Sequence, residues 1–493
     1  MRTPMGGDDA PSLDQQLDAW LAGPSEAFAR AVFFEIQVLG VGLPVVVLLL
    51  VAGAVFCTVY FRGINLRGLP LAYRVLRGDF DRPNAPGEVT HFQALATAIS
   101  GTVGIGNIGG VAVAISVGGP GATLWMIAAG FLGMATKFAE CTLGVRYRKV
   151  HADGTVSGGP MFTLRHGLRE HGREGLGRFL GGFYAVGIVI GCLGIGNMYQ
   201  ANQAFVQLTA VTGGADSALQ GRGWLVGLVL AVVVGAVIIG GIRSIAVVTH
   251  KLVPFMAVLY VGGALIVIAF HLSALPAAIG AILSGAFTAQ GVTGGALGAL
   301  VVGMKRAVFS NEAGLGSASI AHAAVRTDVP ATEGVVALLE PFVDTVVICT
   351  ISALVIGVSI QDYPGFLEGG LEGVALTSDA FGRTVSWFPI PLALAALLFA
   401  VSTMISWAYY GLQGWTYLFG PSAKLQNIYK IIFCSFVAVG AAIRLDAVLD
   451  FSDAMVFVLC VPNLCGLVLL TPVVRAELAR LRTLDAQSGV QAR

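Results

Sequence analysis

The chain has 493 residues, of which 56% are hydrophobic and only 12% charged, and its mean hydropathy is +0.81. Soluble proteins average about 25% charged residues, so this chain lacks the ionic side chains that a soluble protein of its size needs at its surface. The net charge of +1 gives no reason to expect a nucleic-acid partner. Composition therefore disfavours a soluble enzyme and indicates an all-α polytopic membrane protein.

The first 34 residues are acidic and precede the apolar part of the chain. Four of their apolar residues recur at helical spacing: Leu13, Leu17, Trp20 and Leu21. This pattern predicts a short amphipathic helix that lies along the membrane interface. We expect residues 1–34 to be an extracytoplasmic segment, residues 35–474 to be a single transmembrane domain, and residues 475–493 to be a cytoplasmic tail.

Eleven apolar runs follow, each long enough to cross about 30 Å of hydrocarbon, which takes roughly 20 helical residues. Their approximate limits are 35–61, 92–117, 121–145, 181–211, 223–242, 252–271, 289–315, 333–359, 386–417, 428–443 and 453–474. No segment shows the alternating hydrophobicity of a membrane β-barrel. The sequence therefore predicts eleven transmembrane helices and requires no strand.

The basic residues between these runs indicate the orientation. If the N-terminus lies outside, 21 Lys and Arg residues fall in the inner segments and 5 in the outer ones. Cytoplasmic loops carry the excess of positive charge in membrane proteins. An even number of spans would destroy the asymmetry, so we predict eleven spans with the N-terminus outside and the C-terminus inside.

A short motif occurs twice, at an offset of 210 residues. Residues 100–106 and residues 310–316 both follow the pattern S-x-x-x-G-x-G. A second pair, Cys141-Thr142 and Cys349-Thr350, has an offset of 208 residues. These pairs fall in spans 2 and 7 and in spans 3 and 8. Spans 2–6 and 7–11 are therefore predicted to form two five-helix units, the second inverted because five is an odd number.

The glycines of the motif predict broken helices in spans 2 and 7. Each glycine weakens a helix by about 1 kcal/mol relative to alanine. N–H and C=O groups freed at the membrane midplane must find partners in the protein or in a ligand. Paired Gly-interrupted segments in two halves of a chain indicate the binding site of a transporter. The alternative is that these glycines only permit close packing of helices.

Residues 97–112, with the sequence TAISGTVGIGNIGGVA, resemble the signature of the alanine or glycine:cation symporter family. Further segments resemble that family in the same order: 118–121, 133–142, 158–161, 196–203, 306–317, 321–324, 339–345 and 407–411. The resemblance implies a LeuT-type fold with a five-plus-five inverted repeat. It also implies a secondary active symporter that imports small neutral amino acids, such as alanine and glycine, with Na⁺ by alternating access.

The same resemblance implies a multi-pass protein of the bacterial cytoplasmic (inner) membrane, with Na⁺ as coupling ion and no organic cofactor. Its partners are then the amino-acid substrate and the lipid bilayer, and a monomer is compatible with the sequence, which does not fix the oligomeric state. Coupling to H⁺, a broader range of small amino acids and an ion channel are the alternatives. An enzyme is not expected, because the spans contain no nucleophile–base pair and no metal-ligand cluster.

Glu312 lies in the broken part of span 7, next to Asn311, where the ammonium group of an amino acid needs a negative charge. A gating ion pair is the alternative role for this carboxylate. For the substrate carboxylate, span 2 offers a hydroxyl, N–H groups freed by the break, and a side-chain amide. The residues concerned are Thr102, Gly104, Gly106 and Asn107.

In the LeuT-type arrangement, spans 4 and 9 flank the two broken helices. Span 4 is rich in amides, and we expect Gln200 to contact the substrate; hydrogen bonding between helices is the alternative. In span 9, Ser402 and Thr403 would hold Na⁺ together with carbonyl groups of span 2, since hard cations prefer oxygen ligands. These hydroxyls could instead bond back to their own helix. Trp407 would close the pocket and limit the substrate side chain, or serve only in packing.

The other charged residues inside the spans are expected to form ion pairs. Lys137 and Glu140 lie three residues apart on one helix and are predicted to pair with each other. Two cations beside the break in span 7 are predicted to pair with acids of span 8: Lys305 and Arg306 with Glu340 or Asp344.

Overall fold

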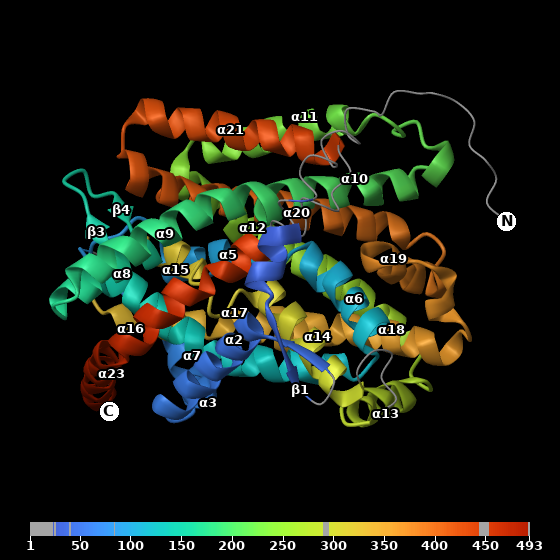
Figure 1. Cartoon of the computed structure of the whole chain (residues 1–493), viewed down its shortest axis with the longest axis horizontal. Coiled ribbons are helices and arrows are strands. Elements are labelled where there is room, and N and C mark those ends of the chain that lie inside the picture. The colour runs from blue at the N-terminus through green and yellow to red at the C-terminus, as the bar shows by residue number, and fades with distance from the viewer. Residues whose placement is uncertain are drawn as a thin grey trace.

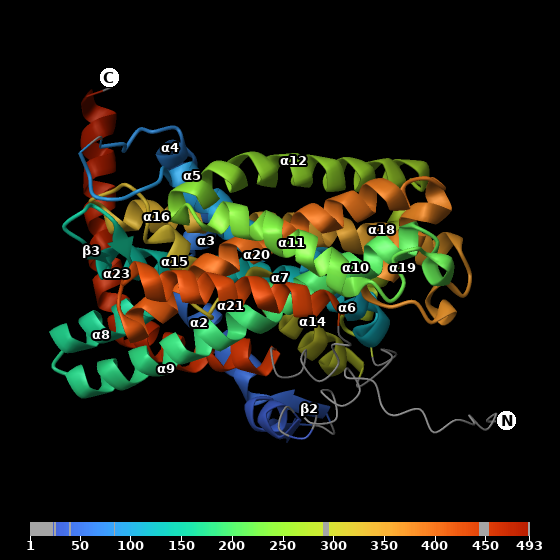
Figure 2. The same cartoon turned by 90° about the horizontal axis from the view of Figure 1, so that it is seen from above.

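A computed structural model describes residue 23 and residues 26–38, 41–82, 84–288, 295–442 and 453–491. The described chain is a helical bundle in which most long helices run along the longest axis of the molecule (Figures 1 and 2). One large hydrophobic core, built mainly from aliphatic and phenylalanine side chains, extends through it. The mostly helical architecture expected from the composition is therefore confirmed.

The first described elements are a β-hairpin and a helix. β1 (Glu35–Val38) pairs antiparallel with β2 (Val41–Pro44), and α2 (Val45–Tyr60) follows directly. The prediction of a helix over 35–61 is wrong for residues 35–38 and 41–44, which form the two strands. Their first segment alternates polar and apolar residues, the period of a strand, and Pro44 disfavours helical backbone in the residue before it. The amphipathic helix predicted around residues 13–21 lies outside the described residues.

Two short helices, α3 (Ile64–Arg67) and α4 (Leu69–Leu76), lead to the first five-span unit predicted from the repeat. Its elements up to the third span are α5 (His91–Thr102), η1 (Gly106–Gly110), α6 (Val111–Gly118), α7 (Ala122–Arg146), β3 (Lys149–Val150), β4 (Val156–Ser157), α8 (Pro160–Glu170), α9 (Glu174–Leu193), η2 (Gly194–Met198) and α10 (Tyr199–Val211). The remaining elements of this part are η3 (Gly214–Asp216), α11 (Gly223–Ile238), α12 (Gly241–Phe270) and α13 (Leu275–Gly285).

The second predicted unit begins with α14 (Gly295–Asn311) and α15 (Ala318–His322). It continues with α16 (Pro330–Ala337), α17 (Leu339–Pro341), η4 (Phe342–Cys349), α18 (Thr350–Asp362), η5 (Phe366–Gly369), α19 (Gly373–Thr384), α20 (Pro389–Phe419), α21 (Ala423–Ala442) and α23 (Cys460–Gln491). The elements α16 to α18 follow one another as one long apolar stretch.

Seven helical stretches of the described chain are long and apolar enough to cross a membrane. Two bent helix pairs raise this number to nine if each pair is one span: α2 with α3–α4, bent by 64°, and α5 with η1–α6, bent by 53°. A described helix overlaps every one of the eleven predicted apolar runs, although α11 has only 16 residues and the start of α14 adjoins undescribed residues. The chain is thus a multi-pass membrane protein.

The loops gather at two opposite ends of the bundle (Figures 1 and 2). We call one of them the β3–β4 end; it holds this hairpin, α8 and the C-terminal end of α23, at the left of both views. Three ion pairs join distant segments there: Arg82 with Asp328 (2.6 Å), Arg146 with Glu477 (3.4 Å) and Arg243 with Glu88 (3.5 Å). At the other end, His271 pairs with Asp362 of α18 and lies 2.9 Å from the hydroxyl of Thr384.

Candidate functional site

The first helix break lies between α5 and η1. α5 begins with a capping box, in which the Gln93 N–H donates to the Thr90 hydroxyl (3.2 Å) and the Thr90 N–H donates to the Gln93 side chain (3.0 Å). The helix ends at Thr102. Within the break, the Gly104 N–H donates to Asn107 Oδ1 (2.8 Å). Asn107 therefore satisfies one of the N–H groups that the break removes from the helical ladder.

The second break separates α14, which ends at Asn311, from α15, which begins at Ala318. Three residues of the connection have left-handed backbone: Glu312 (φ 56°), Gly314 (φ 95°) and Gly316 (φ 82°). Glycine adopts this conformation freely, whereas a residue with a side chain does so at a cost of roughly 1–2 kcal/mol. The glycines of the repeated motif thus lie at both breaks, as the sequence predicts.

Glu140 of α7 and Asn463 of α23 hold the second break. Glu140 Oε1 accepts from the Gly314 N–H (2.9 Å) and from Asn463 Nδ2 (2.7 Å), which also donates to the Gly314 carbonyl (2.9 Å). Glu140 therefore does not pair with Lys137 as predicted. Lys137 Nζ instead lies 2.9 Å from Glu340 Oε1, and the Glu140 carboxylate accepts from the N–H group freed at the break.

A small cavity of about 20 Å³ lies between the two breaks, space for about one water molecule. Seven of the predicted site residues line it: Thr102, Gly104, Gly106, Gln200, Glu312, Thr403 and Trp407. The other lining residues are Gly101, Ile195, Phe309 and Val456. Both broken helices, α10 and α20 therefore meet at one point, where polar groups and apolar walls alternate.

The remaining predicted substrate residues, Asn107 and Asn311, do not line this cavity. Asn107 Nδ2 donates to Ser310 Oγ (3.0 Å) and to Asp344 Oδ1 (2.7 Å). Asn311 Nδ2 donates to Thr345 Oγ1 (2.9 Å). The two amides thus connect the two broken helices to η4 and do not line the cavity.

Glu312 brings a buried carboxylate to the cavity. Its side chain is only 3% exposed, and its Oε2 accepts a hydrogen bond from the Ser317 hydroxyl. Among the described residues, no ion pair includes Glu312. A buried carboxylate is stabilised by a cationic partner, so the cavity can attract a ligand ammonium group.

Hydroxyl groups of α20 face carbonyl groups of α5. Thr403 Oγ1 donates to the Ser100 carbonyl (3.1 Å), and Ser406 Oγ donates to the Thr97 carbonyl (3.0 Å). Ser402 Oγ bonds back to its own helix (2.9 Å) and lies 3.5 Å from the Ser100 carbonyl. Hydroxyl and carbonyl oxygens are ligands that hard cations prefer. The oxygen atoms around the Ser100 carbonyl are therefore of the type that could bind a sodium ion.

The two predicted ion pairs of α14 are not formed in the described chain. Lys305 Nζ lies 4.1 Å from the centre of the Phe33 ring, and the Arg306 guanidinium lies over the Phe309 ring at 5.7 Å. Their predicted acidic partners bind elsewhere: Glu340 contacts Lys137, and Asp344 accepts hydrogen bonds from Asn107, Ser310 and Thr345. Lys305 and Arg306 thus contact aromatic rings, and the two acids have partners other than these cations.

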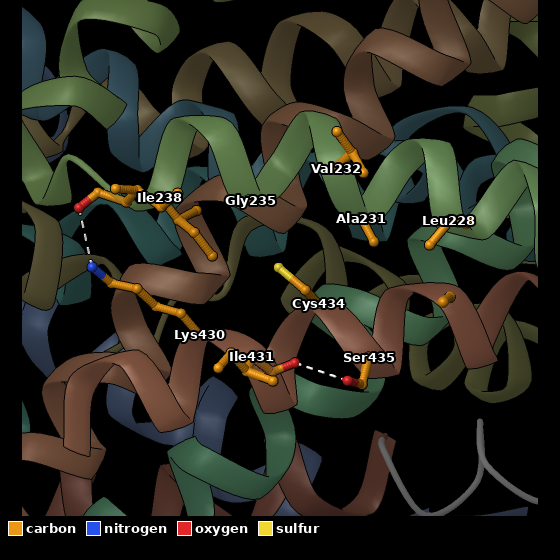
Figure 3. Close-up of a pocket in the computed structure, with 11 residues that line it drawn as sticks. Leu228, Ala231, Val232, Gly235, Ile238, Lys430, Ile431, Cys434 and Ser435 are labelled. Carbon is orange, nitrogen blue, oxygen red and sulfur yellow. Dashed lines mark hydrogen bonds between the residues drawn. The ribbon is translucent and has the colours of Figure 1, made fainter. Parts of the chain in front are cut away.

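A larger hollow, of about 510 Å³, lies between α11 and α21 at an edge of the bundle (Figure 3). Aliphatic side chains such as Leu228 and Ile238 line it, and at its rim Lys430 Nζ donates to the Ile239 carbonyl (3.1 Å). None of the predicted substrate or sodium residues lies in this hollow. An apolar surface of this kind offers no set of groups for the two charges of an amino acid.

A multi-pass helical protein in which two broken helices meet at a buried polar cavity has the architecture of a secondary transporter. Comparison with known proteins agrees with this class. Residues 27–491 match the sodium:alanine symporter family, and the chain belongs to that family. It is therefore an integral membrane transporter and not an enzyme.

Individual relatives cover nearly the whole chain. The sodium/alanine symporter AgcS of Methanococcus maripaludis is 38% identical, over 88% of this chain and 93% of that protein. The probable sodium/glutamine symporter GlnT of Bacillus subtilis is 33% identical, over 87% of this chain and 86% of that protein. Among solved structures, MhsT in complex with L-phenylalanine resembles this chain with a TM-score of 0.58 at 15% identity, covering 77% and 89% of the two chains. This likeness confirms a LeuT-like fold.

Sequence reasoning missed two parts of the site. Ser406, one turn after Ser402, repeats the contact between α20 and α5, and the recurrence of hydroxyls at this spacing is a signal that could have found it. Glu140 and Asn463 meet at the second break although 323 positions separate them, and no local pattern links them. Apolar lining residues such as Phe309 are likewise indistinguishable by sequence from ordinary core residues.

Proposed function

We propose that this protein imports small neutral amino acids, alanine and glycine above all, in symport with Na⁺ by alternating access. The observation that carries the proposal is the cavity between the two helix breaks, where Glu312 and the polar groups around it converge. Membership in the family and the name of the relative AgcS support sodium and alanine as the pair of solutes.

In this proposal Glu312 binds the substrate ammonium, and the Thr102 hydroxyl, the Gln200 amide and N–H groups of the first break bind the carboxylate. The Gly104 N–H already has Asn107 as its acceptor, so Thr102 and Gln200 carry more of the carboxylate recognition than the sequence suggests. Asn107 and Asn311 act by fixing the geometry of the breaks.

The side chains that line the cavity support a small substrate. Trp407 is 2% exposed, and its indole N–H donates to the Gly101 carbonyl (3.2 Å), which fixes the ring against the first broken helix. With Ile195 and Phe309, this ring forms an apolar wall that would limit the length of the substrate side chain once the cavity widens to admit a substrate.

Ser402 and Thr403, with the Ser100 carbonyl, would hold the coupling ion. A Na⁺ ion bound there would attract the carbonyl oxygen of α5 and the hydroxyl oxygens of α20. Thr403 also lines the substrate cavity, so a single side chain contributes to both sites. The hydroxyl and carbonyl groups involved lie on different helices, and their approach is the step that ion binding would favour.

Eleven spans, with the N-terminus outside and the C-terminus inside, remain our proposal for the topology, with inverted repeats over spans 2–6 and 7–11. A helix overlaps each predicted run, and four basic loops predicted to be inside meet at the β3–β4 end. The proposed cytoplasmic tail begins within α23, which continues as a helix to Gln491.

A broader range of small amino acids is the second candidate, and the relative GlnT, named for glutamine, favours it.

One experiment tests the substrate range together with the alternatives of H⁺ coupling and of an ion channel. We would measure uptake of radiolabelled alanine into proteoliposomes under an inward Na⁺ gradient, under a K⁺ gradient, and with a proton ionophore. The proposal expects accumulation above equilibrium with Na⁺ alone, insensitive to the ionophore, and competition by glycine but not by glutamine. Equilibration without accumulation would instead indicate a channel.

A further inference from the structure

Five buried ionisable side chains form a continuous chain near the β3–β4 end of the two broken helices. They are His91 of α5, Glu333 of α16, His322 of α15, Glu340 of α17 and Lys137 of α7, and none is more than 4% exposed. Glu333 contacts the Nδ1 atoms of both imidazoles, that of His91 through Oε2 and that of His322 through Oε1 at 2.6 Å. Glu340 contacts Lys137 through Oε1 at 2.9 Å and faces His322 Nε2 through Oε2 at 3.6 Å.

His322 has a carboxylate oxygen opposite each of its ring nitrogens. A neutral imidazole carries one N–H and presents it to only one of them, whereas an imidazolium presents an N–H to each and carries the positive charge that attracts both. Neither His322 Nε2 nor His91 Nε2 has a hydrogen-bond partner in the described chain, but only that of His322 has a carboxylate oxygen within ion-pair distance, at 3.6 Å. With Lys137 charged and both glutamates ionised, the chain of five is neutral only when one imidazole carries an extra proton. The geometry assigns that proton to His322.

Other titratable groups surround the chain of five on the helices packed against α15. They are Glu140 and Cys141 of α7, Glu312 at the end of α14, Tyr410 of α20, and Arg148 after α7. The two additional carboxylates increase the negative potential and favour a protonated His322. Arg148 forms no ion pair with these carboxylates in the described chain, since its guanidinium donates to four backbone carbonyls; its charge acts on Glu333 from a greater distance.

Two members of the chain of five, His91 and His322, belong to a contact between the segments at the ends of the two broken helices. We call it the β3–β4-end contact and define it as residues 86–91 against residues 322–327. Val89 and Val325 form a parallel β-bridge there. The Glu88 N–H donates to the Ala324 carbonyl, and the Arg326 N–H donates to the Val89 carbonyl, both at 2.8 Å. His91 and His322, joined through Glu333, thus stand on the two segments that this contact holds together.

We propose that His322 is a proton-binding site whose occupancy stabilises the β3–β4-end contact, so that opening this end releases a proton. Loss of the proton leaves an unbalanced negative charge in a buried site, and opening relieves it by admitting water. The inference rests on the proposed function in one respect, namely that this end opens during transport. For one linked proton, the ratio of open to closed protein rises by up to tenfold per pH unit.

A cysteine introduced at the fully buried position of Val325 reports opening through its rate of labelling by a maleimide. We would measure this rate in the full-length purified protein from pH 6.5 to 9. Val325→Cys is compared with Ala152→Cys, on the exposed β3–β4 turn, to correct for thiol ionisation, and the unmodified protein measures the background of seven native cysteines. The corrected rate is expected to rise severalfold or more across this range.

We expect opposite results from two variants, His322→Gln and Glu340→Gln, each combined with Val325→Cys. In His322→Gln the proton site between the two carboxylates is lost, and His91, which faces only Glu333, is the one imidazole left, so labelling at position 325 should be fast and largely independent of pH. In Glu340→Gln the remaining charges balance without the proton, so labelling should be slow and independent of pH. The control His171→Gln, which changes an exposed histidine at the same end, should retain the pH dependence of the parent.

A parent protein without pH dependence, or a His322→Gln variant that keeps it, would overturn the proposal. If His322→Gln does not fold, Glu340→Gln decides, and retention of the parental pH profile in that variant overturns it as well. The labelling experiment needs no substrate. Failure of the proposed function would appear separately, as an absence of sodium-driven alanine accumulation by the parent protein.

Discussion

The hydroxyl of Thr403 on α20 donates a 3.1 Å hydrogen bond to the carbonyl of Ser100, two residues before α5 ends at the first break. The same threonine lines the cavity, and a Cβ atom added to Gly104 would lie 2.8 Å from its Oγ1. One side chain therefore lies against both the proposed ion ligands and the proposed substrate. This adjacency gives a physical basis for coupling, since any movement of α20 relative to α5 changes both sites together.

Replacement of Ser402 and Thr403 by alanine should abolish the sodium dependence of alanine uptake. Thr403→Ala alone is expected to raise the Na⁺ concentration for half-maximal uptake by about tenfold, roughly 1.4 kcal/mol. Ser402→Ala should have a smaller effect, because this hydroxyl is bonded mainly to its own helix. Uptake is measured against Na⁺ concentration in proteoliposomes, with Ser435→Ala in the hollow between α11 and α21 as control. Undiminished sodium dependence in the double variant would refute the site.

Glu312→Gln should reduce alanine uptake by at least 100-fold while the protein still folds. Glutamine keeps the shape of the side chain and its contact with the Ser317 hydroxyl but removes the charge proposed to bind the ammonium. Folding is checked by thermal unfolding of the purified protein, and uptake by initial rates. Glu174→Gln, which affects only an exposed pair with Arg178, is the matched control. Uptake at the parental rate would exclude a substrate role for this carboxylate.

Gly104→Ala should impair transport, whereas Gly110→Ala should not. The added Cβ at position 104 would press against Thr403 Oγ1 at 2.8 Å and approach Gln200 Oε1 at 3.7 Å, which narrows the cavity. At Gly110, in the same broken helix, nothing lies within 4 Å of the added atom. Initial rates should show an increase in KM of tenfold or more for the first variant. Equal effects of the two substitutions would contradict the proposed position of the substrate.

Arg148→Ala should loosen the β3–β4-end contact at every pH. The Arg148 guanidinium donates to the carbonyls of Pro86 (2.7 Å), Ala323 (2.8 Å), Val325 (2.5 Å) and Thr327 (2.6 Å). Burial lowers the pKa of Arg148 to about 10, so the side chain is still charged at neutral pH, and its donors change little below pH 9. Maleimide labelling of the Val325→Cys protein should therefore accelerate at each pH from 6.5 to 9 and still depend on pH.

Arg148→Lys should give an intermediate rate of labelling, because an ammonium group cannot reach four acceptors in the plane that a guanidinium spans. Arg178→Ala, on the exposed surface of α9, is the control and should leave the rate unchanged. A rate in Arg148→Ala equal to that of the parent would show that the β-bridge alone holds the contact.

The sequence predicts those features that depend on local patterns. Apolar runs locate the long helices, and the repeated glycine motif locates both breaks, since only glycine adopts the backbone at Gly314 and Gly316 without cost. The motif also leads to Gly104, Gly106 and Glu312 at the cavity. The β1–β2 hairpin is not predicted, although its alternation of polar and apolar residues is visible, because an apolar stretch follows it without interruption.

The partners of buried polar groups are predicted less well. Asn107 and Asn311 are chosen correctly as residues of the breaks, but their amides reach Ser310, Asp344 and Thr345 instead of the cavity. Glu140 is assigned to Lys137, its neighbour in sequence, and binds Gly314. Such choices depend on which unsatisfied N–H group lies closest in three dimensions, and spacing along the chain carries no information about it.

The cavity of about 20 Å³ has a consequence for any measurement of affinity. Alanine is several times larger than one water molecule, so the walls around Glu312 and Trp407 must separate before substrate fits. The observed dissociation constant then contains the free energy of separating those walls as well as the energy of the contacts themselves. Substitutions that ease helix movement far from the cavity should tighten binding without touching the ligand, and affinity in this protein reports gating together with recognition.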